Sequence, residues 1–329
     1  MTAVVRERSP EAAVSPPRWR RWAQVTVGAG ILAAILIQVG AEPFLRGLAS
    51  VSPWAIATAF ALTAVATAAA AWRWRLLASR LGLELGWGES VSAYYRSQFL
   101  NTVLPGGVVG DVHRAVEHGR SVEQVAQAAR AVAAERAVGQ GVQLVLAAVV
   151  LASIGFSAYA PAVGPVLGVV LGVVLVVGAA VAVALASRRA RAALAHELAI
   201  LRGAFSSAST VVRLVAASTI VVAAHVGTFV VACAAVGVDA TPGQITAAAV
   251  LAVLASAIPL SIGGWGPREG VASWAFAVAG LGAATGIAAS TTYGVLAMIA
   301  VAPGALVLAA SFHRRRRGVA SIDAGGWTR

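Results

Sequence analysis

The sequence contains no lysine, a single cysteine (Cys233) and few charged residues of either sign. One cysteine excludes an internal disulfide, and its place within an apolar run indicates neither a metal site nor a redox centre. The chain also lacks a nucleophile elbow, a phosphate-binding loop, an HExxH motif and paired cysteines. These absences exclude the common hydrolase, nucleotide-binding and zinc-site patterns. They predict a protein that is not an enzyme and that uses no cofactor.

The composition is that of a membrane protein. Only 12 % of the 329 residues are charged, whereas a soluble globular protein carries about 25 %. Hydrophobic residues make up 59 % of the chain, and the mean hydropathy is +0.82. Several apolar runs approach or exceed the roughly 18 residues typical of a spanning helix. The sequence therefore predicts an all-α, polytopic helical membrane protein.

All 25 basic residues are arginine, and the net charge of +12 raises the question of nucleic-acid binding. The arginines fall in short segments between apolar runs, which is the distribution of the positive-inside rule. No basic-aromatic patch or recognition motif accompanies them, so no nucleic-acid partner is expected. The expected outer loops hold only Glu42, Arg46 and Asp239. This asymmetry predicts a multi-pass protein of the cytoplasmic (cell) membrane with both termini inside.

The chain divides into a disordered cytoplasmic arm (1–21), a single integral membrane domain (22–310) and a basic cytoplasmic tail (311–329). About eight membrane segments are expected. Val39-Gly40-Ala41 resembles a signal-peptide cleavage site, but the length of the preceding run and the tryptophans at its inner edge favour an uncleaved anchor. The expected elements are spans at 22–39, 53–71, 138–159, 163–186, 211–236 and 286–310, shorter apolar segments at 90–104 and 244–262, an amphipathic interfacial helix at 121–136 and a cytoplasmic loop around 188–202.

Two stretches share an unusual layout: an apolar run, a proline and paired glycines, then adjacent charges. They read QFLNTVLPGGVVGDVHR (98–114) and IPLSIGGWGPREG (258–270). Proline removes a backbone donor and glycine tolerates open backbone angles, so both stretches should contain broken helices. In a membrane, unwound backbone survives only where protein or a wet cavity satisfies it. If the chain enters the first stretch from the cytoplasmic face of the membrane and the second from the outer face, the two form broken or re-entrant helix pairs of opposite topology. This arrangement predicts a possible inverted repeat, as in transporters with midplane binding sites.

The charges beside these breaks predict the chemistry of the site. Arginine matches phosphate through bidentate hydrogen bonds, so Arg114 and Arg268 favour an anionic lipid headgroup as ligand. Charge at mid-membrane is costly, and cross-pairing of Asp111 with Arg268, or of Glu269 with Arg114, would lower that cost. The alternative is that these side chains lie at the interface and only snorkel.

Other polar residues near the breaks leave two interpretations open. Gln98 and Asn101 share a helix face, where they either line a cavity or hydrogen-bond a neighbouring helix. Glu135 and Arg136 form either an interfacial ion pair or part of the site. The scattered histidines lack metal-ligand spacing and are expected to be structural.

QFLNTVLPGGVVGDVHRA, AAERAVGQG and IPLSIGGWGPREG resemble, in this order, motifs of the lysylphosphatidylglycerol synthase transmembrane (flippase-like) family. The resemblance spans roughly Trp22 to Ala310, and Val108-Val109-Gly110 departs from it where many members have a further glycine. The motif positions that it carries over as site residues, in addition to Gln98 from the helix-face argument, are Asn101, Pro105, Gly106, Gly107, Gly110, Asp111, Arg114, Glu135, Arg136, Gly263, Gly264, Arg268 and Glu269.

The resemblance implies a membrane domain that translocates or binds an anionic phospholipid or a lipid-linked precursor. Residues 311–329 are too few for the soluble domain that transfers aminoacyl groups in full synthases, so that activity is not expected. The main alternative is a membrane-embedded partner or regulator of a separately encoded lipid-modifying or glycosyl-transferring enzyme. A glycosyltransferase is disfavoured because the outer loops hold so few acidic residues, and a small-molecule exporter would have to bind ligands without acyl chains. The sequence does not indicate the oligomeric state.

Overall fold

The computed structural model describes residues 26, 33, 36–38, 40–154, 187–258 and 263–311, and these residues form helices and connecting turns without any strand. The predicted all-α class is confirmed. Four predicted segments lie wholly or mostly outside the described residues: the arm, the tail, the span at 163–186 and most of the span at 22–39. The helices are α2 (Glu42–Ala49), α3 (Pro53–Arg80), α4 (Trp87–Val103), α5 (Val109–Ser121), α6 (Val125–Ile154), α8 (Arg188–Ala204), α9 (Ala208–Val236), α10 (Pro242–Ser256), α11 (Pro267–Val278) and α12 (Ala283–Ala300).

Four helices in the described part of the chain are long and apolar enough to cross a membrane: Pro53–Arg80, Val125–Ser153, Ala208–Val236 and Ala283–Ser311. They contain the described parts of the spans predicted at 53–71, 138–159, 211–236 and 286–310. The last one turns at 301–302 before it continues through 303–311. The number of segments, the sides of the termini and the division into arm, domain and tail stay predictions.

The structure adds detail to three local expectations. The predicted interfacial helix (121–136) begins at Val125 and runs without interruption into the span as α6, and its interfacial position stays a prediction. Ser121 ends α5, and its hydroxyl donates to the carbonyl of His118 rather than capping a following helix. The connection predicted around 188–202 contains α8, whose alanine, leucine and arginine residues favour helix. The predicted outer loop contains α2.

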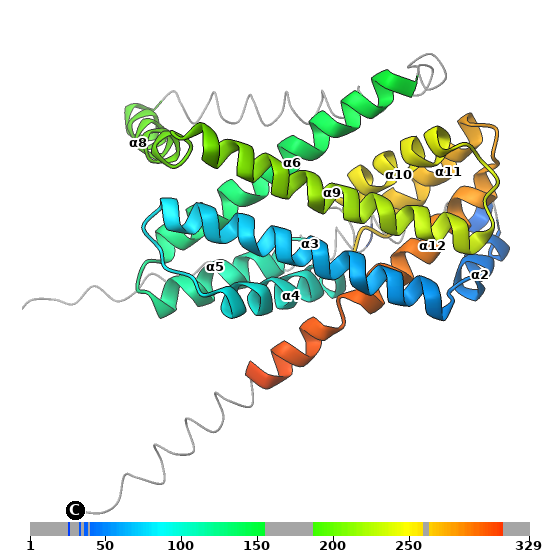
Figure 1. Cartoon of the computed structure of the whole chain (residues 1–329), viewed down its shortest axis with the longest axis horizontal. Coiled ribbons are helices and arrows are strands. Elements are labelled where there is room, and N and C mark those ends of the chain that lie inside the picture. Colours follow the sequence, from blue (N-terminus) through cyan, green and yellow to red (C-terminus); the bar gives the residue numbers. More distant parts are fainter. Residues whose placement is uncertain are drawn as a thin grey trace, which may run out of the picture.

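Both predicted helix breaks are confirmed. The chain leaves helical conformation between α4 and α5, where Gly106 and Gly107 have φ of 98° and 58°. It does so again between α10 and α11, where Gly263 and Gly264 have φ of 58° and 82°. Such angles favour glycine because a side chain would meet the backbone. Figure 1 shows α4 and α5 towards one end of the long helices and α10 and α11 towards the other.

The helices pack through small residues. α3 lies along α9, and α12 contacts α2, α3, α9 and α11. The main core consists largely of alanines gathered around Phe229, Phe276 and Tyr293. Small side chains let helices approach closely. This matters in a membrane, because lipid tails are as apolar as the side chains and the hydrophobic effect contributes little to helix association. The long helices therefore form a close framework around the two breaks.

Candidate functional site

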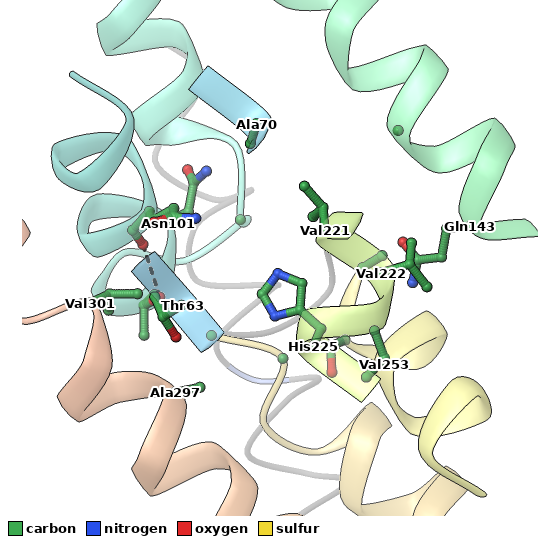
Figure 2. A pocket seen from close by; sticks show the side chains of 18 of the residues that line it. Thr63, Ala70, Asn101, Gln143, Val221, Val222, His225, Val253, Ala297 and Val301 are labelled. Atoms are coloured by element: carbon green, nitrogen blue, oxygen red, sulfur yellow. Dashed lines mark hydrogen bonds between the residues drawn. The ribbon is translucent and has the colours of Figure 1, made fainter. Parts of the chain in front are cut away.

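A cavity of about 290 Å³ lies where the two broken helix pairs meet the long helices. The α4–α5 break contributes Gly107 to its wall, and the α10–α11 break contributes Gly263 and Gly264. Figure 2 shows side chains from several helices pointing into this space. The two sequence motifs, separated by well over a hundred residues, thus line one cavity.

Each long helix lines the cavity with one face, because its lining residues recur every three or four positions. Most of these residues are polar or small. The lining residues are Thr63, Ala70 and Arg73 on α3; Arg136, Gly139, Gln140 and Gln143 on α6; Ser218, Val221, Val222, His225 and Thr228 on α9; and Tyr293, Gly294 and Ala297 on α12.

Asp111 is the polar centre of the first motif. Its Oδ1 accepts hydrogen bonds from Ser97 Oγ at 3.0 Å and from Arg114 Nη2 at 3.2 Å. Its Oδ2 accepts from Asn101 Nδ2 at 3.2 Å and lies 3.1 Å from Nε of Arg136. Both oxygens of this carboxylate are therefore engaged by the protein itself.

Further hydrogen bonds hold the first break in shape. Asn101 Oδ1 accepts from the backbone N–H of Gly110 at 2.7 Å, which ties the end of α4 to the start of α5. Arg136 donates from Nη2 to the carbonyl of Gly107 at 2.6 Å. Gln98 accepts from the hydroxyl of Thr67 at 2.9 Å. Gln98 and Asn101 therefore both line the cavity and bond neighbouring groups, so the two interpretations of these residues hold together.

Behind the cavity wall lies a cluster centred on Glu135, which is fully buried. Its Oε1 accepts from both Nε and Nη2 of Arg73, and from the hydroxyl of Tyr94 at 3.1 Å. Its Oε2 accepts from Nη2 of Arg114 at 2.9 Å. The Arg114 guanidinium lies 4.3–4.4 Å from the ring centroids of Tyr94 and Trp74. Nε and Nη1 of Arg114 have no hydrogen-bond partner in the described structure, and the cation–π contacts with the two rings are the interactions left to this side of the guanidinium.

The second motif forms its own buried pair. Arg268 donates to Glu269 Oε1 from Nη2 at 2.5 Å and from Nε at 3.0 Å, and to Ser290 Oγ at 3.0 Å. Glu269 Oε2 accepts from the backbone N–H of Gly266 at 2.6 Å. The Arg268 guanidinium also lies over the ring of Trp265, at 4.9 Å from its centroid.

The predicted cross-pairing of the motifs is wrong. Arg268 pairs with its neighbour Glu269, whereas Arg114 pairs with Glu135 and Asp111. The reason is local. The capping contact at Gly266 holds Glu269 beside Arg268, while the adjacent α6 supplies a closer carboxylate for Arg114.

The structure divides the predicted site residues into two groups, and their role in binding stays a prediction. Those that line the cavity are Gln98, Asn101, Gly107, Asp111, Arg136, Gly263, Gly264 and Arg268. The others do not line the cavity but belong to the helix breaks or pair with charged lining residues: Pro105, Gly106, Gly110, Arg114, Glu135 and Glu269. The interfacial ion pair proposed as the alternative for Glu135 and Arg136 does not form, since their partners are other residues.

Several lining residues are not among those predicted from the sequence. From the sequence, Arg73 belongs to the arginines between apolar runs, and His225 to the scattered histidines expected to be structural. Both lie on polar stripes within apolar helices, with Thr63 preceding Arg73 and Ser218 preceding His225 on the cavity-lining face. Polar residues repeated on one face of an apolar helix were the sequence signal that could have identified these lining residues. In the described part of the chain no group of three or more His, Cys, Asp or Glu side chains could hold a metal ion.

The charged groups around the cavity do not cancel. Among the described residues, those that line the cavity or pair directly with a lining residue include four arginines and three carboxylates. One positive charge is therefore in excess. The arginines are Arg73, Arg114, Arg136 and Arg268, and the carboxylates are Asp111, Glu135 and Glu269.

The chain matches a known protein family. Residues 21–318 match the family model described as Lysylphosphatidylglycerol synthase TM region. Neither the curated proteins nor the solved structures gave a match. The family match covers most of the chain, and the long apolar helices agree with it. The chain is thus a multi-pass membrane protein that belongs to the lysylphosphatidylglycerol synthase transmembrane family.

Proposed function

We propose that this protein moves an anionic phospholipid, or a lipid-linked precursor, between the leaflets of the cell membrane. The observation that carries this proposal is the cavity that both broken helix pairs line, with an excess positive charge around it. The headgroup occupies the cavity while the acyl chains stay in the bilayer. No covalent step is required, so the protein acts as a carrier rather than as an enzyme.

Arg136 is the side chain best suited to meet the phosphate. It is 41 % exposed, whereas Arg114 and Arg268 are almost fully buried. Its guanidinium has five N–H donors, of which only part are used on Asp111 and Gly107. This corrects the expectation that Arg114 holds the phosphate, because Arg114 does not line the cavity. Arg268 lines it from the opposite motif and supplies the second positive charge.

The test is a flip assay in vesicles that contain acyl-labelled fluorescent phosphatidylglycerol, with dithionite added outside. Wild-type protein should expose inner-leaflet probe to the reductant, and Arg136→Gln should slow this exposure. Loss of one charge-assisted contact corresponds to about a 10- to 100-fold effect. The variant should fold, because Asp111 keeps its bonds to Ser97, Asn101 and Arg114.

Arg46→Gln is the matched control, since Arg46 forms an exposed ion pair with Glu42 away from the cavity. It should flip lipid at the wild-type rate. Wild-type protein that leaves the inner-leaflet probe protected would refute the carrier proposal. A different result would instead support the alternative, a regulator of a separate enzyme. In that case the inner-leaflet probe stays protected from dithionite, the protein retains bound lipid tightly, and a lipid-modifying enzyme co-purifies with it.

A further inference from the structure

Helix α8 lies crosswise to helices that are long enough to span the membrane. Figure 1 shows α8 almost end-on, at the end of the molecule where α3 ends and α9 begins, whereas α3 and α9 run lengthwise across the view. Both α3 and α9 are long and apolar enough to cross a bilayer. A helix that crosses the ends of such spans runs along the membrane surface, where lipid headgroups meet water.

One face of α8 is held by the protein. The carboxylate of Glu197 accepts hydrogen bonds from Nε and Nη2 of Arg130 on α6, both at 2.6 Å. Leu201 packs against the apolar cluster that contains Leu77, and Ala204 is buried. These contacts fix the rotation of α8 about its own axis. They therefore decide which of its side chains face away from the protein.

The face turned away combines leucines with arginines. Leu194 and Leu198 lie one turn apart and are 39 % and 42 % exposed. Arg191 precedes Leu194 by three positions, and Arg202 follows Leu198 by four, so the four side chains share one side of the helix. We call them the α8 stripe. Apolar side chains bordered by arginines are typical of a helix that lies in the membrane interface, because arginine stems extend along apolar surface and carry the charge out to the headgroups.

The charge of α8 is complementary to an anionic surface. The helix has four arginines and one carboxylate, and Arg130 already pairs with that carboxylate, Glu197. Among the described residues, none of the four arginines forms an ion pair. The first turn holds no acidic side chain, so the charges of Arg188 and Arg189 add to the positive end of the helix dipole. Lipid phosphates would supply the missing negative charge, and guanidinium binds phosphate through paired hydrogen bonds.

We propose that the α8 stripe binds the surface of an anionic bilayer, with its leucines among the upper acyl chains and its arginines on lipid phosphates. This surface is separate from the cavity, and the inference does not depend on the carrier proposal. An acidic protein would also match the arginines. The leucines between them, and the position of α8 across the ends of the spans, favour the bilayer.

A fluorophore on the stripe tests this proposal. Ala195 is exposed three positions before Leu198, and Ala195→Cys is labelled with bimane in the full chain. The unlabelled background is clean, because the native Cys233 is buried. The protein is placed in nanodiscs of phosphatidylcholine, or of equal parts phosphatidylcholine and phosphatidylglycerol, with a trace of nitroxide-labelled phosphatidylcholine as quencher. The quenched fraction gives the ratio of inserted to released α8.

Phosphatidylglycerol should raise this ratio by at least about tenfold, since each arginine near an anionic surface contributes about fivefold. A label at His196→Cys is the positional control. His196 is exposed on the opposite face of α8, two positions from both leucines of the stripe. Its label should stay unquenched in both kinds of nanodisc.

Charge variants then assign the effect to the stripe. Arg191→Gln combined with Arg202→Gln should lower the ratio about 25-fold in nanodiscs with phosphatidylglycerol and leave it unchanged in phosphatidylcholine. Arg80→Gln combined with Arg120→Gln is the matched control, because it removes the same charge from exposed positions at the ends of α3 and α5. The control should keep the wild-type ratio. All four arginines are exposed, so none of these substitutions should unfold the protein.

Three results would overturn the proposal. The Ala195 label could be quenched equally with and without phosphatidylglycerol, which would show insertion without recognition of charge. It could stay unquenched in both, which would leave an acidic protein as the occupant of the stripe. The matched control could lose as much as the Arg191 and Arg202 variant, which would show a response to net charge alone. Each result can be read whether or not the protein flips lipid.

Discussion

Glu135→Gln tests whether the buried cluster behind the cavity supports the fold. The Glu135 side chain is fully buried, and its carboxylate is shared by Arg73 and Arg114, which are 6 % and 1 % exposed. The substitution keeps the shape but removes the only carboxylate that Arg73 pairs with in the described structure. Breaking a buried ion pair from one side costs about 3–5 kcal/mol, because the partner charge stays buried. We expect the free energy of unfolding to fall by about 3 kcal/mol at least.

Equilibrium unfolding in mixed micelles of sodium dodecyl sulfate measures this difference. Glu42→Gln is the control, since Glu42 pairs with Arg46 at 2.6 Å but is 80 % exposed. Exposed ion pairs contribute about 0–1 kcal/mol, so this variant should unfold almost as wild type does. An unfolding free energy for Glu135→Gln within about 1 kcal/mol of that control would show that the cluster is not a major source of stability.

Two further predictions concern the second motif and the surface. A Cβ at Gly294 would overlap the Arg268 guanidinium. Gly294→Ala should therefore displace Arg268 and weaken the binding of phosphatidylglycerol. Gly141→Ala is the control, because a Cβ at Gly141 meets nothing within 4 Å, and it should leave this binding unchanged. Arg130 on α6 hydrogen-bonds both carboxylate oxygens of Glu197 on α8 at 2.6 Å, and this lowers the pKa of Glu197 below its ordinary value of 4.5. A lowered folded-state pKa means that the pair stabilises the protein above about pH 4.5 and that this contribution is lost as the pH falls further. The unfolding difference between wild type and Glu197→Gln should therefore be present at pH 7 and shrink as the pH falls below about 4.5; a difference that stays constant as the pH is lowered through the acid range would contradict this assignment.

The helix breaks were predictable because their causes are local. Pro105 with Gly106 and Gly107, and Gly263 with Gly264, disfavour helix whatever packs around them. The glycine φ values in the structure agree with this. Their meeting at one cavity followed from a further argument, that unwound backbone in a membrane has to be satisfied in a shared polar interior.

The pairing of the charges was not predictable in the same way. Whether Arg114 meets Glu135 or Glu269 depends on which helices are neighbours, and α5 packs on α6. Arg73 was missed because it stands in the run Trp72-Arg73-Trp74-Arg75, which has the composition of a membrane-edge belt. Only the helical phase distinguishes Arg73, which faces the cavity, from Arg75, which bonds the carbonyl of Leu85.

In the described structure no ion pair joins the two motifs, and this bears on how the proposed carrier would open. An ion pair across the cavity would have to be broken in a low-dielectric interior each time the two halves separated. Here Arg268 pairs with Glu269 in its own motif, and Arg114 pairs with Asp111 in its own motif and with Glu135 on the adjacent α6. The breaks themselves approach through Gly263, where a Cβ would lie 2.8 Å from the backbone oxygen of Thr102. Separation at this contact breaks van der Waals contacts but separates no charges, so the arrangement suits a protein whose two broken helix pairs move relative to each other as a headgroup passes.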